Sequence, residues 1–229
     1  MPSGSLESRT REQVLNGANI AAIKSVATAN WEVFQFQKAE LIGPGEFRLS
    51  NLLRGQFGTD GIMPDLHPTH ADFVLLDGNS VQVPYPLSAR GLQRNYRVGP
   101  SSRGYDDPSF QLFSKSFSGV GLRPHAPEHL RASLRQNGDC SISWVRRSRS
   151  VEDGWEGVDV PIFEDAETYS VRIFLGTELK IERTSSSPQL VLAATELQSL
   201  NITSPFTIEV AQISNQFGAG PYKRIIFNG

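Results

Sequence analysis

Histidine and aspartate residues are concentrated between positions 60 and 77 of this sequence. They are His67, His70, Asp60, Asp65, Asp72 and Asp77. Imidazole and carboxylate groups on a loop are ligands that zinc or manganese accepts. Pro64 and Pro68, however, prevent a helix that would place both imidazoles on one face. We therefore expect solvated loop residues here and predict no metal site.

The chain shows no other arrangement of residues that is typical of catalysis. It contains no G-x-S-x-G elbow, no phosphate-binding P-loop and no H-E-x-x-H pair. Paired carboxylates for glycoside hydrolysis cannot be assigned, because their separation of roughly 5 to 9 Å is a property of the fold. We predict that the protein is not an enzyme, has no catalytic residues and uses no cofactor.

Arg54 is the first candidate contact residue. It lies in Leu52–Asp60, LLRGQFGTD, where two glycines bracket a short polar and aromatic segment. Its guanidinium could contact an anionic partner, or it could be held by a carboxylate such as Asp60. We favour the structural role, because the glycines already make this a shape-defining turn.

Trp155 is the second candidate contact residue. It lies between Gly154 and Gly157, within a segment, 148–166, that carries six acidic residues. A ring flanked by glycines is poorly placed for a core, and exposed tryptophan is a favoured anchor for protein or sugar surfaces. Contact with a partner and packing onto its own domain both remain open. The other two tryptophans, Trp31 and Trp144, are assigned to the core.

The stretch Trp31–Asp60 carries the strongest structural signal, that of a β-hairpin. Apolar residues alternate on either side of the turn Gly43-Pro44-Gly45, at Phe34, Phe36, Phe47 and Leu49. Pro44 fixes one φ angle, and the flanking glycines can take positive φ. This break therefore favours a chain reversal over a continuous strand.

A short helix of about residues 10–24 is predicted ahead of the hairpin. Thr10 and Gln13 form a capping box, in which the two side chains can satisfy opposite free amides. Apolar residues then fall on one helical face, at Val14, Ala18, Ala21 and Ala22. We expect this small apolar face to dock on a sheet.

The predicted fold is mainly β, with two domains. Residues 1–122 should form a β domain that includes the helix, with further strands at Phe73–Leu76, Val81–Val83, Asn95–Val98 and Phe110–Phe117. A proline-containing linker, 121–128, leads to a second domain at 123–229. Its seven short strands are the number expected of a two-sheet sandwich: His129–Leu134, Cys140–Val145, Thr168–Phe174, Leu179–Arg183, Leu190–Ala193, Phe206–Ile213 and Tyr222–Phe227.

Composition excludes several classes of protein. Lys and Arg number 22 against 24 Asp and Glu, so the chain lacks the electrostatic footprint of a nucleic-acid-binding protein. Cys140 is the only cysteine, so no internal disulfide can form, and we expect it to be buried. No stretch approaches the ~20 apolar residues of a membrane helix, and the start lacks the apolar core of a signal peptide. We expect synthesis in the cytoplasm and no membrane insertion.

The hairpin and the loop after it resemble the late region of the large tail-tip, or host-specificity, protein of siphophages and gene transfer agents. That family contains variants of Q-F-x-x-A-E followed by L-L-R-G-x-x-G-T-[DE]. Here the pattern stands at Gln35, Phe36, Ala39, Glu40, Leu52–Gly55 and Gly58–Asp60. The similarity extends to Ser5–Ser8, Leu15–Asn19, Phe73–Leu76 and Trp144–Arg149.

This resemblance implies a non-enzymatic structural and adhesion piece of a phage-like tail tip or baseplate, of the megatron-like kind. The implied partners are other tail-tip proteins and a component of the host cell surface, such as a polysaccharide, and the implied final location is the virion. Intact proteins of this kind would assemble as homotrimers. The present chain, which we expect to be a carboxy-terminal fragment or a truncated copy, could be monomeric.

Residues 123–229 also resemble a fibronectin type III module. The similarity lies in Trp144, Tyr169–Ile173, Phe206–Val210 and Asn215–Gly220. It implies that Trp144 and Tyr169 pack between two sheets. Phe206 stands where the family usually has a corner tyrosine, so the hydroxyl tether of that tyrosine is absent.

The alternative from another class is a carbohydrate-binding or carbohydrate-cleaving accessory protein, with Trp155 or the His67 loop as its site. A concave surface lined with exposed aromatic rings, or paired carboxylates in a cleft, would favour it. A weaker alternative is a cellular adhesion protein that uses the type III module alone.

Overall fold

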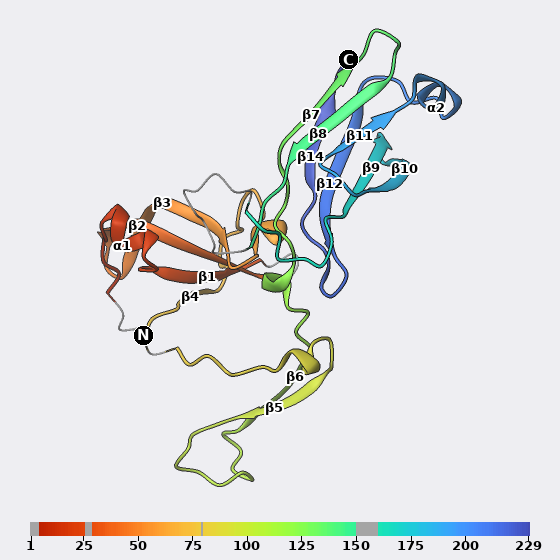
Figure 1. The fold of residues 1–229 in the computed structure, drawn as a ribbon. Coiled ribbons are helices and arrows are strands. Elements are labelled where there is room, and N and C mark those ends of the chain that lie inside the picture. The colour runs from red at the N-terminus through yellow and green to blue at the C-terminus, as the bar shows by residue number, and fades with distance from the viewer. Residues whose placement is uncertain (1–4, 26–28, 79, 150–159) are drawn as a thin grey trace. The chain divides into compact units, whose positions relative to one another are not determined.

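The computed structural model describes residues 5–25, 29–78, 80–149 and 160–229, and antiparallel strands dominate it (Figure 1). The contacts between residues divide the chain into two compact units. One consists of residues 1–77 together with 121–229, and the other of residues 78–120. No helix among the described residues has the length and apolar character needed to cross a membrane.

The first sheet has the strand order β3-β2-β1-β4. Its strands are β1 (Ile20–Lys24), β2 (Trp31–Gly43), β3 (Glu46–Gln56) and β4 (Phe73–Leu75), and a 3-10 turn, η1 (Asp60–Ile62), follows β3. The predicted hairpin is confirmed as β2 and β3, and Gly45 takes the positive φ, 74°, that the turn requires. A small core of Ala21, Phe34 and Phe36 lies on one face of this sheet.

The predicted helix of residues 10–24 is wrong beyond Leu15. Helix α1 spans only Arg11–Leu15, with the predicted capping box of Thr10 and Gln13 at its start. Gly17 and Asn19 have φ of 95° and 56°, which are conformations that end a helix. The next residues form β1, which pairs with both β2 and β4 and so buries its alanines in a sheet. Pairing with two strands outweighs the local helical pattern.

Residues 78–120 form a compact unit of their own, which the prediction of one domain over 1–122 does not separate. It contains η2 (Leu87–Ala89) and the antiparallel hairpin of β5 (Arg94–Val98) and β6 (Gln111–Lys115), and η3 (Val120–Leu122) begins at its end. The Tyr96 ring stacks on Phe113, with centroids 5.4 Å apart. The strand predicted at Val81–Val83 does not form, and both valines are exposed.

The second predicted domain contains a two-sheet sandwich (Figure 1). All seven predicted strands are present: β7 (Glu128–Leu134), β8 (Cys140–Val145), β9 (Tyr169–Leu175), β10 (Glu178–Ser185), β11 (Gln189–Leu192), β12 (Phe206–Ser214) and β14 (Lys223–Phe227). The short β13 (Gly218–Ala219) and helix α2 (Ala194–Ser199) were not predicted. One sheet has the order β11-β8-β7 and the other β10-β9-β12-β13, with β14 also paired to β12. This is the strand order of a fibronectin type III-like sandwich.

Two of the three tryptophans were assigned to the core, and the structure confirms one of them. Trp144 is 4% exposed and packs edge-on against Tyr169, with ring centroids 5.0 Å apart. Trp31 is instead 38% exposed, and the Lys24 ammonium lies 5.8 Å from its ring centroid. Trp31 occupies the first position of β2, so it lies at the end of the sheet and not over its centre.

Candidate functional site

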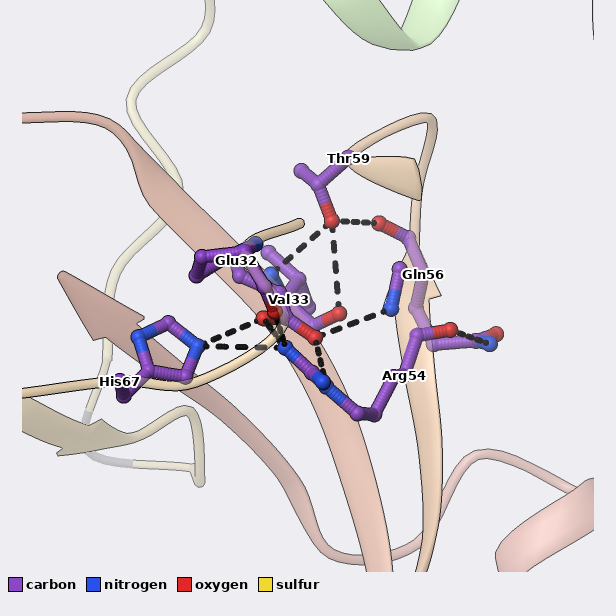
Figure 2. A network of polar contacts seen from close by, with 8 residues as sticks. Glu32, Val33, Arg54, Gln56, Thr59 and His67 are labelled. Carbon is purple, nitrogen blue, oxygen red and sulfur yellow. Dashed lines mark hydrogen bonds and ion pairs between the residues drawn. The ribbon is translucent and has the colours of Figure 1, made fainter. Parts of the chain in front are cut away.

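The LLRGQFGTD stretch contacts one buried carboxylate, that of Glu32 (Figure 2). Glu32 lies on β2 and its side chain is 1% exposed. Arg54, on the neighbouring strand β3, donates from Nε to one carboxylate oxygen at 2.9 Å and from Nη2 to the other at 2.7 Å. This two-bond geometry is the strongest form of arginine–carboxylate contact.

Further contacts join this ion pair to the backbone of β3 and to the loop that follows it. The Arg54 Nη2 also donates to the carbonyl of Pro64 at 2.7 Å. Nε2 of His67 lies 2.7 Å from the Glu32 carboxylate, and the amide of Gly55 donates to that carboxylate at 3.3 Å. The arginine, the histidine and the carboxylate thus form one network that fixes the path of the chain after β3.

Gly55 and Thr59 give this loop its shape. Gly55 has φ of 64°, and a Cβ placed on it would lie 2.8 Å from Cα of Asp60. The Thr59 hydroxyl accepts from the amide of Val33 at 3.0 Å and donates to the carbonyl of Gln56 at 2.7 Å. The loop therefore returns to β2 through a position that only glycine fits and a hydroxyl that bridges two backbone segments.

The ion pair shifts the pKa values of both of its members. Burial on its own would raise the pKa of the Glu32 carboxyl, but hydrogen bonds from Arg54 and His67 and the charge of Arg54 outweigh it and lower that pKa. The pKa of Arg54 is raised, chiefly by its hydrogen bond to Glu32. Both groups are charged at neutral pH, which is the state that a structural ion pair requires.

The Q-F-x-x-A-E half of the pattern also serves the fold. The Gln35 side-chain amide donates to the carbonyls of Val14 and Ala18, at 2.6 and 2.8 Å, at the end of α1. Phe36 is fully buried in the core of the sheet. The first half of the pattern thus attaches the N-terminal segment to the sheet, and the second half attaches the loop after β3.

The predictions for Arg54, Trp155 and the His67 loop compare differently with the structure. Arg54 is engaged by Glu32 and not by Asp60, and its contact with an anionic partner stays a prediction. Trp155 lies outside the described residues, so its two alternatives stay as the sequence leaves them. His67 contacts Glu32, and within the described ranges no group of three or more His, Cys, Asp or Glu could hold a metal ion.

A second cluster, which the sequence did not single out, lies in the loop between β5 and β6. We call it the hairpin pocket. Its cavity of about 410 Å³ is lined by Arg97, Val98, Gly99, Pro100, Ser101, Arg103, Tyr105 and Phe110. The Tyr105 and Phe110 rings stack with centroids 5.7 Å apart, and the Arg97 guanidinium lies 5.4 Å from the Phe110 centroid. Tyr105 is 73% exposed, so much of its ring remains accessible.

The hairpin pocket depends on Gly99, which lies just after β5. A Cβ placed on Gly99 would lie 2.5 Å from the Phe110 ring, so the ring packs directly on the backbone. The signal available in the sequence was the density of arginine and aromatic residues between 94 and 110. A prediction of strands from alternating apolar residues takes no account of arginine and aromatic residues that cluster in this way.

Part of the chain matches the model of one known protein family. Residues 1–74 match the family model described as "Rcc01698-like, C-terminal", a family associated with the gene transfer agent of Rhodobacter capsulatus. The matched range contains both halves of the pattern described above. No curated protein matches the sequence.

Solved structures give weaker similarities. The Clostridium perfringens spore cortex lytic enzyme SleM is 12% identical over 46% of this chain and 28% of its own, with a TM-score of 0.30. Domains d3-d4 of the rat CD45 extracellular region are 11% identical over 99% of both chains, with a TM-score of 0.35. The chicken CNTN1 FN1-FN3 domains are 15% identical over 93% of this chain and 57% of theirs, with a TM-score of 0.31. The present chain thus spans 28% of the length of SleM.

Proposed function

We propose that this chain is a non-enzymatic structural and adhesion part of a phage-like or gene transfer agent tail-tip (baseplate) protein that contributes to host-surface recognition. The match of residues 1–74 to the Rcc01698-like family carries the proposal. The fibronectin type III-like sandwich is compatible with it, since such sandwiches occur in many cell-surface domains. Its partners would be other tail-tip proteins and a host cell-surface component, and it would act from the virion, where the intact protein would form a homotrimer.

The geometry of the first sheet supports a structural role for the residues of the pattern. The carboxylate of Glu32 is buried, and Arg54 and Gln35 are engaged in contacts within the sheet and its loop. These groups position the chain and leave recognition to other surfaces. Host recognition would then depend on the sandwich or on the unit of residues 78–120.

Purified phage-like or gene transfer agent particles provide the direct test of the proposed function. Mass spectrometry of purified particles should detect the chain, and electron microscopy should show assembled tails when residues 78–229, which include both the unit of residues 78–120 and the sandwich, are deleted. Such particles should adsorb to host cells at least tenfold less than the parent. Particles that carry Arg48→Ala, a change at an exposed arginine of β3, serve as the control. Absence of the chain from particles, or full adsorption after the deletion, would contradict the proposal.

A carbohydrate-binding accessory protein is the second candidate, and the hairpin pocket favours it. An exposed aromatic ring beside arginine is a suitable surface for a sugar. Such a protein would bind polysaccharide without belonging to a particle. The two candidates therefore differ in whether the chain copurifies with tails, and the genes beside its own give a second check.

A further inference from the structure

The unit of residues 78–120 is basic within an acidic chain. It contains five cationic and two acidic residues, whereas the whole chain has a formal net charge of −2. The cationic residues are Arg90, Arg94, Arg97, Arg103 and Lys115, and the acidic ones are Asp106 and Asp107. This local excess of positive charge favours an anionic partner.

Two of these arginines line the hairpin pocket. Arg97 lies over the paired rings of Phe110 and Tyr105, at 5.4 and 6.0 Å from their centroids, and forms no ion pair with a carboxylate of the described chain. Arg103 is 3.9 Å from Asp107, and its side chain is 65% exposed, so this contact is weak. At least one guanidinium in the pocket is therefore available to an incoming anion.

We propose that the hairpin pocket binds a uronic acid residue of an acidic polysaccharide. The guanidinium of Arg97 would donate two hydrogen bonds to the sugar carboxylate. The accessible ring of Tyr105 would pack against the apolar C–H face of the pyranose. A cavity of about 410 Å³ lies within the range of small-molecule sites. The inference names the ligand class for the proposed host recognition, and in that sense rests on the proposed function.

The pocket suits an acidic sugar better than a nucleic acid strand. Single-stranded nucleic acid binds along a positively charged groove with successive stacking platforms. The pocket offers one pair of rings, already stacked on each other, and two arginines. One guanidinium and one accessible aromatic ring suit a single acidic sugar, which presents one carboxylate and one apolar ring face.

The experiment measures binding of the purified chain by isothermal titration calorimetry. The probes are polygalacturonate, alginate and hyaluronate. Fully methyl-esterified polygalacturonate serves as the uncharged match, and an oligothymidylate as the nucleic acid. We expect at least one acidic polysaccharide to bind and the ester to bind at least tenfold more weakly. Arg97→Gln and Tyr105→Ala should each weaken binding at least tenfold.

Arg94→Gln is the matched control. Arg94 lies on the same hairpin, and its removal changes the net charge equally, but it stacks on Tyr85 and does not line the pocket. Equal losses for Arg94→Gln and Arg97→Gln would show unspecific charge attraction and overturn the inference. Tighter binding of the oligothymidylate, or no binding of any acidic polysaccharide, would overturn it too. Circular dichroism of each variant separates lost binding from lost folding.

Adsorption of particles separates this inference from the proposed function. If particles contain the chain and require it for adsorption, but Arg97→Gln particles adsorb like the parent, the proposed function stands and the pocket inference fails. If particles lack the chain, the proposed function fails. Calorimetry on the purified chain still decides whether the pocket binds acidic sugars.

Discussion

The Glu32 carboxylate and the Arg54 guanidinium face each other across β2 and β3 and share two hydrogen bonds, of 2.9 and 2.7 Å. Glu32 is 1% exposed and Arg54 is 29% exposed, so the pair is largely removed from water. Such a pair adds little net stability over apolar residues of the same size, but removal of one partner leaves an uncompensated buried charge. The pair therefore selects one arrangement of the loop after β3.

Arg54→Ala should lower the local free energy of unfolding by about 3 kcal/mol, because it leaves the Glu32 carboxylate buried without its cation. Native-state hydrogen exchange of β2 and β3 amides in increasing urea measures this local stability. Arg48→Ala is the matched control on the same strand. Its partner Glu40 is 3.7 Å away and both side chains are mostly exposed, so its loss should stay below about 1 kcal/mol. Equal effects of the two variants would contradict the structural role of Arg54.

Gly55→Ala and Gly45→Ala should differ, although both glycines have positive φ. At Gly45 an added Cβ meets nothing within 4 Å, so only the backbone cost of about 1 to 2 kcal/mol applies. At Gly55 the Cβ would lie 2.8 Å from Cα of Asp60, which adds about 1 to 3 kcal/mol for displaced backbone. Urea unfolding of both variants measures the difference. Equal stabilities would show that the loop relaxes freely around residue 55.

The sandwich could be predicted from sequence because its signals are local. Seven runs of alternating apolar residues, separated by turns, predicted seven strands of the sandwich with ends that differ from the structure by at most two residues. Ile20–Lys24 shows the opposite case. Its alanines fit a helical face, and only pairing with β2 and β4, which are distant in sequence from each other, makes it a strand.

The partner of Arg54 could not be predicted for a related reason. Asp60 is near in sequence, but Glu32 lies on the other strand of the hairpin, and their contact depends on the strand register. That register shifts between Val33 and Gln35, which turn composition does not indicate. The hairpin pocket was missed because Arg97 and Phe110 are brought together by the register of β5 and β6 and by the packing of the Phe110 ring on the backbone of Gly99.

Acid should destabilise the first sheet through Glu32. Its pKa in the folded protein is lowered from the ordinary value of 4.5, so its stabilising contribution is complete above pH 4.5 and is lost as the pH falls through the folded value. Between pH 6 and pH 3 the parent should therefore lose more local stability than Glu32→Gln, which has no carboxylate to protonate. Hydrogen exchange of β2 and β3 amides across this range measures both. Parallel curves for the two proteins would rule out this origin of acid sensitivity.

Cys140 should react with a thiol reagent only when the sandwich opens. It is fully buried on β8, and burial raises the pKa of its thiol. In the folded protein a reagent therefore cannot reach the sulfur, and little of the thiol is ionised to the reactive thiolate. Labelling with Ellman's reagent at pH 8 should be slow in buffer and immediate in guanidinium chloride. Ile142→Ala, two residues further along the same buried face, should cost about 3 kcal/mol. It should therefore speed labelling by roughly a hundredfold, because reaction through opening follows the population of the open state. Rapid labelling of the native parent would show that the thiol is accessible without opening of the sandwich.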